Sequence, residues 1–380
     1  MSIYLDNAAT SFPKPAFVIR AMHDALTQIG ASPGRGSHRQ AREAFEIVAA
    51  CRARAARLLG VRDPSRIVFT KNATEAINIA LKGWLRPGDR AVISAMEHNS
   101  VARPLSRLKS QGVIVDVAPC SARGRLDLDA FEKMLSPPPR LVCMVHASNV
   151  NGALQPVREA ALLCAKAGVP LMIDAAQTAG IQPIEAEGWG LGMLACSGHK
   201  ALLGPPGTGI LYVKAGLDVL PLMEGGTGSR SEELVQPEHY PDRLESGTPD
   251  LPAIAGLSEG IDFVLGKGVA NILARDLRLA ELLEKELGAI SGVRVLIPEV
   301  RGTGTVSFVV SGMNPADVGH LLDEGFGIAV RTGLHCAPMA HQTLGTFPSG
   351  TVRVSPGYLT TLDDIDRFLK SLGALLSRRS

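Results

Sequence analysis

The sequence predicts an α/β protein with a mostly parallel central sheet in a large domain and a smaller α+β domain near the C-terminal end. First, short apolar runs alternate with helical patterns through the first two thirds of the chain. Second, these runs are apolar almost throughout, which is typical of parallel strands covered on both faces. Third, a shorter alternation of strands and helices begins after residue 300.

The expected elements follow in chain order. Strands of the large domain are expected at residues 66–70, 90–94, 113–117, 141–145, 170–174 and 209–213. Helices are expected between them, at 74–84, 100–111, 128–135 and 157–167. The Gly- and polar-rich stretch 224–252 predicts a long functional loop, and 254–288 predicts a long helical region. The small domain has expected strands at 304–310, 328–331 and 351–355, and helices at 315–324 and 362–377.

Length and composition limit the classes of protein to consider. A chain of 380 residues holds two domains without disulfide staples, and we assign 16–250 to the large domain and 1–15 with 251–380 to the small one. Basic and acidic side chains nearly balance, 39 against 37, which favours neither nucleic acid nor an anionic membrane as a partner. No apolar run approaches the roughly 18–20 residues of a membrane span. Six cysteines without paired spacing and no signal-like start predict a reduced, cytoplasmic protein.

The candidate chemistry centres on Lys200 and on an acid upstream of it. Asp174 closes the apolar strand 170–174, and Lys200 follows in the small-residue turn Ser197-Gly-His-Lys. A buried carboxylate needs a partner, and the protonated nitrogen of a pyridine ring is one. A lysine that forms a Schiff base, together with such an acid, is what pyridoxal 5'-phosphate (PLP) requires. Alone, Asp174 is equally a helix cap and the lysine turn a surface turn, but their combination favours a PLP site.

Polar residues at other strand ends fit the same cofactor. Ala73 and Thr74 begin a helix whose free N–H groups suit a phosphate, although the segment taken alone is more often an ordinary helix cap. Neither a Walker A pattern nor a dinucleotide-binding glycine motif is present, which favours a phosphate-bearing cofactor other than a nucleotide. Gln177 is placed to reach the phenolic oxygen of the cofactor. His98 is a candidate for ring stacking and proton transfer, although a lone histidine is more often structural.

The C-terminal domain supplies a candidate thiol. Cys336 follows His335 in a loop flanked by glycine and proline, with Arg331 nearby, and cationic neighbours favour the reactive thiolate. A buried, inert Cys336 is the alternative, whereas the other cysteines have mostly apolar neighbours and are expected in the core. Arg353 lies in an expected strand and suits bidentate capture of a substrate carboxylate, with a structural ion pair as the competing interpretation.

With these motifs assembled, the chain resembles class V aminotransferase-fold enzymes of the cysteine desulfurase and selenocysteine lyase family. The resemblance implies the PLP-dependent transferase fold, type I, and extends over nearly the whole chain. The motifs that carry it lie at residues 4–11, 70–78, 97–98, 148–149, 174–177, 197–200, 331–338 and 351–353. The loop Arg331-Thr-Gly-Leu-His-Cys336 is similar to that of the Suf-type enzymes.

The resemblance implies a role for each motif. Lys200 carries the cofactor and moves protons, Asp174 pairs with the pyridine nitrogen, and Cys336 receives the sulfur. The other implied cofactor contacts are Ala73, Thr74, His98, Asn149, Gln177, Ser197, His199 and Thr248 of the partner subunit in a homodimer. The implied substrate contacts are Ala8, Arg35, His38, Asn149, Arg331 and Arg353. No metal is expected.

The implied activity converts L-cysteine to L-alanine and passes the sulfur through a persulfide on Cys336 to an acceptor protein, as in iron–sulfur cluster assembly. Two departures leave the substrate preference and the acceptor open. Leu334 stands where the family often has histidine, and Pro33-Gly-Arg-Gly differs from the usual His-Arg-Gly. The alternatives are a selenocysteine lyase, another PLP-dependent C–S lyase, or a non-catalytic sulfur-carrier scaffold of the same fold.

Overall fold

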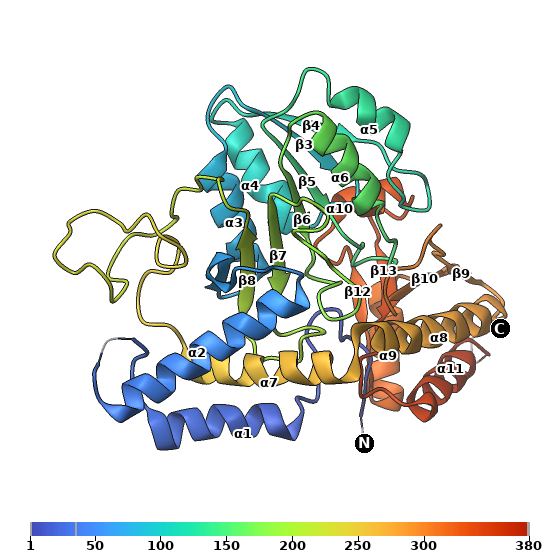
Figure 1. Cartoon of the computed structure of the whole chain (residues 1–380). Helices are drawn as coiled ribbons and strands as arrows, with labels where there is room; N and C mark the ends of the chain where they lie inside the picture. The colour runs from blue at the N-terminus through green and yellow to red at the C-terminus, as the bar shows by residue number, and fades with distance from the viewer. Residues whose placement is uncertain (1, 35, 378–380) are drawn as a thin grey trace.

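The computed structural model describes residues 2–34 and 36–377, and a seven-stranded sheet forms its centre (Figure 1). The strand order is β2-β8-β7-β6-β5-β3-β4. Only β8 runs against its two neighbours, and the remaining pairs are parallel. The mostly parallel sheet is thereby confirmed. Its strands are β2 (Ile67–Thr70), β3 (Arg90–Ser94), β4 (Ile114–Ala118), β5 (Leu141–Val145), β6 (Leu171–Asp174), β7 (Met193–Ser197) and β8 (Gly209–Val213).

Alternate residues of these strands enter two different hydrophobic clusters, because successive side chains of a strand point to opposite faces. On β5, for example, Val142 and Met144 belong to one cluster and Leu141 and Cys143 to the other. The helices of the first cluster are α2 (Arg39–Leu58), α5 (Leu128–Met134), α6 (Val157–Lys166) and α7 (Leu251–Lys267). The helices of the second are α3 (Ala73–Trp84) and α4 (Asn99–Lys109). The sheet is therefore covered on both faces, as its apolar strands predict.

A second, antiparallel sheet of order β12-β13-β10-β9 forms the core of the C-terminal region. Its strands are β9 (Val293–Val295), β10 (Val306–Val310), β12 (Arg331–Gly333) and β13 (Thr351–Val354). The helices α8 (Val269–Gly288), α9 (Pro315–Phe326) and α11 (Leu362–Ser377) pack against it, and the short α10 (Pro338–Thr343) follows the cysteine loop. The N-terminal β1 (Ile3–Tyr4) pairs in parallel with β11 (Ile328–Ala329), which ties the start of the chain to this region.

Several elements differ from those predicted. The strand β7 and the N-terminal helices α1 (Ala16–Asp24) and α2 were not among the expected elements. The helical region 254–288 consists of two helices that separate at Gly268, whose φ of 80° favours glycine. The expected strand 328–331 is divided between β11 and β12, which belong to different sheets. The domain boundary near residue 250 stays a prediction, and α7 packs against α1 and α2.

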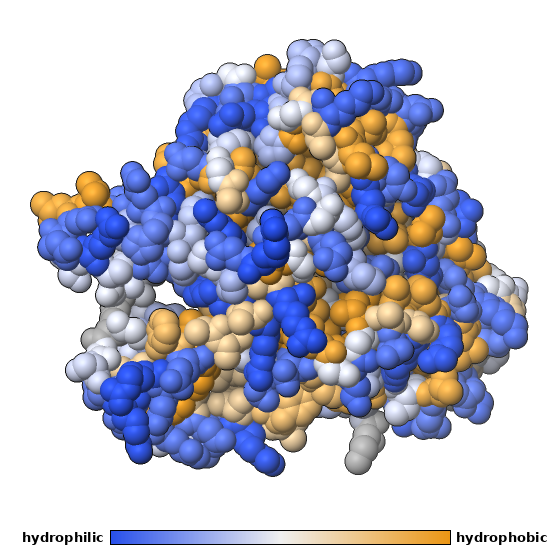
Figure 2. Space-filling model, in the orientation of Figure 1, coloured by the Kyte–Doolittle hydropathy of each residue, from blue (hydrophilic) through white to orange (hydrophobic). Residues whose placement is uncertain are grey.

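Residues 224–250 form a long loop that projects from the body of the molecule (Figure 1). Leu234 and Val235 on this loop are exposed, and Figure 2 shows apolar atoms at the end of the projection. Between Ala73 and Leu251 this loop is the longest segment without helix or strand. Among the described residues, no helix combines the length and apolar character that a membrane span requires.

Candidate active site

A cavity of about 300 Å³ lies between the carboxyl ends of the central strands and the antiparallel sheet. Its walls come from the segments that follow β2, β3, β5, β6 and β7, from the N-terminal segment, and from β12 and β13. Parallel strands end at one edge of a sheet, which explains why residues far apart in sequence meet there. The predicted residues that line it are Ala8, Ala73, Thr74, His98, Asn149, Asp174, Gln177, Ser197, His199, Lys200, Arg331 and Arg353.

Lys200 and Asp174 line this cavity together. Burial lowers the pKa of Lys200 to about 8, although the nearby Asp174 opposes the shift. Burial likewise raises the pKa of Asp174. A hydrogen bond of 2.9 Å from Ala176 N to Asp174 Oδ1 and the positive charge of Lys200 both lower this pKa, but they offset the effect of burial only in part. A lysine with this pKa is partly neutral near pH 8, and the neutral amine is the form that attacks an aldehyde.

The start of α3 forms the polar end of the cavity. Asn72 is the N-cap, since its Oδ1 accepts a hydrogen bond of 2.9 Å from Glu75 N. The ordinary helix cap that was the alternative interpretation is therefore present. The first turn of the helix still lines the cavity, where its N–H groups can bind an anion. Thr74 Oγ1 lies 2.8 Å from Ser100 Oγ, and Ser197 and His199 approach from the end of β7. Together these groups suit a phosphate.

His98 is the N-cap of α4, and its Nδ1 accepts a hydrogen bond of 3.0 Å from Ser100 N. Burial lowers its pKa to about 4, and the charge of Lys200 contributes. The imidazole is therefore neutral near pH 7, with its proton on Nε2. Gln177 is held by the N-terminal segment, because its Nε2 donates to Ala8 O over 3.0 Å. The stacking and phenolic-oxygen roles of these two residues stay predictions.

Arg353 on β13 is almost wholly buried and makes an ion pair with Asp6, with 2.6 Å between Nη2 and Oδ1. Its Nη1 donates to Asn149 O over 3.0 Å, while its buried Nε has no partner. The structural ion pair that was the alternative interpretation of Arg353 is thus present. These two hydrogen bonds use two of the five guanidinium N–H groups, so the ion pair is compatible with binding of a ligand carboxylate.

Cys336 is exposed, which excludes the buried interpretation. Its Sγ lies 3.8 Å from Arg331 Nη2, and its neighbour His335 lines the cavity. His335 and Cys336 have φ values of 47° and 56°, and such left-handed residues cost about 1–3 kcal/mol each. The loop is held by hydrogen bonds of 2.8 Å from Asn99 N to Cys336 O and 2.7 Å from Asn149 Nδ2 to His335 O.

The other cysteines differ from Cys336 in their surroundings. Four of them are buried and Cys120 is half-buried. Burial raises the pKa of the thiols of Cys51, Cys120, Cys164 and Cys196 to about 12. These thiols therefore remain protonated near neutral pH. The prediction of core positions is confirmed for the four buried cysteines, Cys51, Cys143, Cys164 and Cys196.

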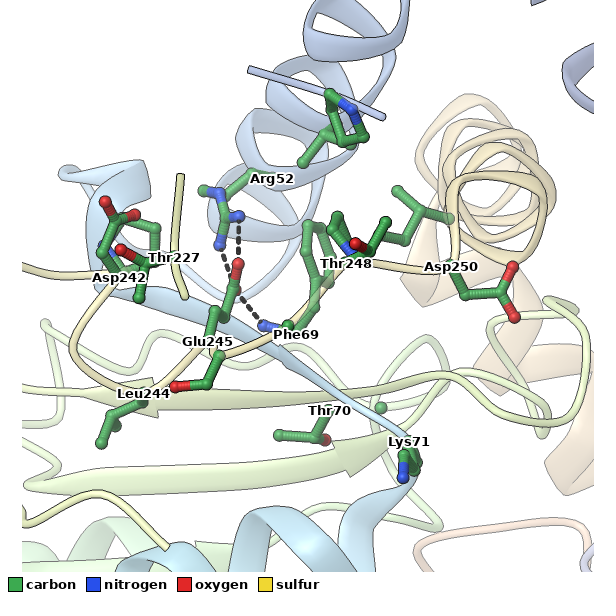
Figure 3. Close-up of a pocket in the computed structure, with 18 of the residues that line it drawn as sticks. Arg52, Phe69, Thr70, Lys71, Thr227, Asp242, Leu244, Glu245, Thr248 and Asp250 are labelled. Atoms are coloured by element: carbon green, nitrogen blue, oxygen red, sulfur yellow. Dashed lines mark hydrogen bonds and ion pairs between the residues drawn. The ribbon is translucent and has the colours of Figure 1, made fainter. Parts of the chain in front are cut away.

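Cys336 is not among the residues that line the cavity, although its neighbour His335 is, and two further predicted residues, His38 and Thr248, also lie elsewhere. His38 is the N-cap of α2, where its Nδ1 accepts from Ala41 N over 3.3 Å. Thr248 lines a separate groove of about 940 Å³ (Figure 3), beside an ion pair of 2.7 Å between Arg52 and Glu245. Arg35 lies outside the described residues.

Sequence reasoning missed several residues at the site. Asp6 fell within the motif 4–11 but received no role, because its partner Arg353 is distant in sequence. Lys14 Nζ donates to His199 O over 2.9 Å, and burial lowers its pKa to about 8. Glu97 is fully buried, accepts from Val145 N over 2.9 Å, and has its pKa raised by burial to about 8. No sequence pattern distinguished Lys14, whereas the position of Glu97 beside His98 was a usable signal.

The donor set fits PLP. Buried polar atoms without a hydrogen-bond partner include Asn149 Oδ1, His199 Nδ1 and Arg353 Nε, all on residues that line the cavity. Buried polar groups are paired as a rule, so these atoms await a polar ligand. The helix start offers donors to a phosphate, Asp174 an acceptor to a pyridine nitrogen, and Lys200 an amine to an aldehyde.

The fold and this site define the class of fold type I PLP enzymes. A family model described as aminotransferase class-V matches residues 3–368, and the chain belongs to this family, whose members depend on PLP. The chain is similar to a probable cysteine desulfurase of Methanothermobacter thermautotrophicus, with 34% identity over 96% of this chain and 92% of that protein. A probable cysteine desulfurase of Synechocystis is 32% identical over 98% and 91%.

The chain is also similar to solved structures of cysteine desulfurases. The apo structure of a cysteine desulfurase from Thermococcus onnurineus NA1 has a TM-score of 0.91 and 32% identity, covering 99% of this chain and 95% of that one. The cysteine desulfurase CsdA from Escherichia coli, in an S-sulfonic acid form, has a TM-score of 0.89 and 28% identity, with the same coverage. The predicted fold type is therefore confirmed.

Proposed function

We propose that this chain is a PLP-dependent cysteine desulfurase that converts L-cysteine to L-alanine and takes the sulfur as a persulfide on Cys336. One observation carries the proposal. The thiol of Cys336 is exposed and lies 3.8 Å from Arg331 Nη2. Cys336 directly follows His335, which lines the same cavity as Lys200 and Asp174. The names of the relatives and of the solved structures support the same activity.

The residues present can hold the cofactor and the substrate. Ala73, Thr74, Ser197 and His199 would hold the phosphate, Asp174 the pyridine nitrogen, and Lys200 Nζ the aldehyde carbon. The chemistry that bound PLP supplies is electron withdrawal from Cα of the amino acid, which makes its Cβ–S bond labile. Arg353, which lines the cavity, would bind the substrate carboxylate through its guanidinium group.

The sulfur transfer itself is carried out by the chain's own groups. The Cys336 thiolate attacks the substrate sulfur, an S–S bond forms, and the Cβ–S bond breaks with its electron pair left on carbon. Lys200 Nζ takes the proton from Cα and supplies protons to the carbon skeleton, which leaves as alanine. Arg331 stabilises the thiolate before the attack. A thiol reductant then releases sulfide and regenerates Cys336.

A single assay tests the activity. Purified enzyme with PLP receives L-cysteine and a thiol reductant, and sulfide and alanine are quantified together. Equal amounts of both, lost in Cys336→Ala while the visible spectrum of the bound cofactor persists, support the proposal. Persulfide formation that survives in Cys336→Ala removes Cys336 from the mechanism.

The alternatives give different results in the same assay. Turnover of selenocysteine alone identifies a selenocysteine lyase, and release of pyruvate and ammonia identifies another C–S lyase. A colourless protein that binds no PLP identifies a sulfur-carrier scaffold.

The proposal includes a homodimer in which Thr248 serves the cavity of the other subunit. Two features of the monomer support it. The groove of Figure 3 is wide and contains exposed apolar side chains, among them Phe45 and Met223. Asn72 lines both this groove and the cavity, so a second copy seated in the groove would reach the start of α3.

Mixing two inactive variants tests the shared site. Lys200→Ala removes the covalent attachment, and Thr248→Glu places a carboxylate near the phosphate. If each site takes Thr248 from the other subunit, a mixed dimer contains one site with both defects and one site with neither. Activity should therefore return on mixing and subunit exchange. If activity does not return although co-purification of differently tagged subunits shows that mixed dimers have formed, Thr248 lies outside the site of the other subunit.

The last parts of the proposal concern the surroundings of the enzyme. The exposure of Cys336 suits delivery of its sulfur to an acceptor protein, and a disulfide-trapped complex from cells tests this. Absence of any such adduct, with free sulfide as the only product, contradicts protein delivery. The cytoplasmic location predicted from the sequence belongs to the same proposal and is tested by cell fractionation.

A further inference from the structure

Asn149 contacts three parts of the site at once. Its side-chain Nδ2 donates to His335 O over 2.7 Å, in the loop that carries Cys336. Its backbone O accepts from Arg353 Nη1 over 3.0 Å. Its side-chain Oδ1 is buried without a partner, and the residue lines the cavity. One amide group therefore faces the thiol loop with its nitrogen and leaves its oxygen unsatisfied.

The loop depends on such anchors because of its backbone. His335 and Cys336 both adopt left-handed φ values, which side-chain-bearing residues keep only when surrounding contacts impose them. The other anchors are Asn99 N to Cys336 O and the pair of His335 Nε2 with Thr351 Oγ1, each 2.8 Å. Two of the anchoring side chains line the cavity and contain a buried atom without a partner, Asn149 Oδ1 and His335 Nδ1, and of these two residues only Asn149 lies outside the loop.

We propose that Asn149 is a positioning residue that couples cofactor binding to the placement of Cys336. A polar group of the ligand that satisfies Oδ1 fixes the orientation of the amide, and this orientation keeps Nδ2 on His335 O. The loop is then held with Cys336 Sγ beside Arg331. Without the ligand, rotation of the amide releases His335 O and the loop relaxes. The inference rests on the proposed function, since it concerns the thiol that receives the sulfur.

Hydrogen–deuterium exchange of the peptide 331–339, with and without PLP, tests the coupling. In the wild-type enzyme, loading with PLP should slow exchange in this peptide by about 10-fold, as expected for a loop whose local opening is suppressed. In Asn149→Asp, an oxygen still faces the cavity but the donor to His335 O is lost. Loading should then leave the exchange of this peptide unchanged, and the rate of persulfide formation should fall by about 10- to 100-fold.

Gln177→Ala is the matched control. Gln177 is also an amide that lines the cavity, but its Nε2 donates to Ala8 O and not to the thiol loop. This variant weakens the hold on the ligand, yet at full loading, verified by visible absorbance, PLP should still protect the peptide 331–339. Asn149→Ser, which is too short to reach His335 O, serves if Asn149→Asp does not fold.

The outcomes separate this inference from the proposed function. Protection of the loop in loaded Asn149→Asp or Asn149→Ser to the wild-type level overturns the coupling. Loss of protection in loaded Gln177→Ala also overturns it, because the effect would then report ligand loss in general. A wild-type enzyme that forms no persulfide on Cys336 defeats the proposed function, whereas its exchange data still decide whether Asn149 couples the loop to the cofactor.

Discussion

Arg353 and Asp6 form a buried ion pair, 2.6 Å between Nη2 and Oδ1, that joins β13 to the N-terminal segment at the wall of the cavity. Arg353 is almost fully buried, so its positive charge needs the opposite charge of Asp6 to offset the cost of burial. Removal of one partner of a buried pair leaves an uncompensated charge. We therefore expect Asp6→Asn to lower the free energy of unfolding by about 3 kcal/mol, measured by urea denaturation at neutral pH.

A half-exposed ion pair provides the control for this variant. Arg54 and Glu259 lie 3.0 Å apart with both side chains partly in solvent. Glu259→Gln should cost less than about 1 kcal/mol, because solvent screens such pairs. If Asp6→Asn costs no more than this control, the Arg353–Asp6 pair does not stabilise the fold.

The lowered pKa of Lys200 predicts how cofactor attachment depends on pH. Burial lowers this pKa from 10.5 to about 8, and the neutral amine attacks the aldehyde. The neutral fraction grows as pH rises, so attachment of PLP to the apo protein should speed up through about pH 8 and level off above about pH 9. Stopped-flow absorbance measures the rate. A rate that keeps rising to about pH 10, as for an ordinary lysine, contradicts the shift.

Gly209→Ala should disturb the phosphate end of the cavity. An added Cβ would lie 2.5 Å from the carbonyl carbon of Asn72, the N-cap of α3. We expect a loss of about 1–3 kcal/mol of stability and weaker binding of PLP, measured by denaturation and by equilibrium titration. Gly373→Ala in α11 is the control, since its Cβ meets no atom within 4 Å. Unchanged PLP affinity in Gly209→Ala would show that β8 does not set the position of α3.

His98 should not titrate near neutral pH. Its pKa is lowered to about 4, mainly by burial, so the imidazole of the apo protein should stay neutral between about pH 5 and 8. Histidine nitrogen NMR measures this, with His98→Gln to assign the signal. Titration of His98 within this range would mean that the imidazole is not desolvated.

The sequence predicted the cavity best where one rule applied repeatedly. Asp174, His98 and Thr74 each follow a strand of the parallel sheet, and carboxyl ends of such strands meet at one edge. The pairing of Asp6 with Arg353 could not be found in this way, because it depends on the pairing of β1 with β11, which brings the N-terminal segment to the C-terminal region. His38 was expected at the site, yet its side chain is used to cap α2.

Fold prediction failed where local signals were weak or divided. The strand β7 is as long as β5, but its buried run Met193–Ser197 continues directly into the lysine turn, whose small residues predict a turn and not a strand. The long helical region was continuous in pattern, and only Gly268 marked the break between α7 and α8. Periodicity identifies faces and elements, but it does not determine which sheet a strand of two or three residues joins.

The N-terminal segment has a consequence for how the enzyme is made. Residues 3–8 leave the ribosome well before their partners, so that β1 waits for β11, and Asn7 N waits for Ser355 O, 3.1 Å away in the folded chain. The strands of the large sheet can assemble on the nascent chain in the meantime. The N-terminal wall of the cavity closes only once Ser355 has emerged. Cofactor loading is therefore expected after this segment has been made and not while the large sheet assembles.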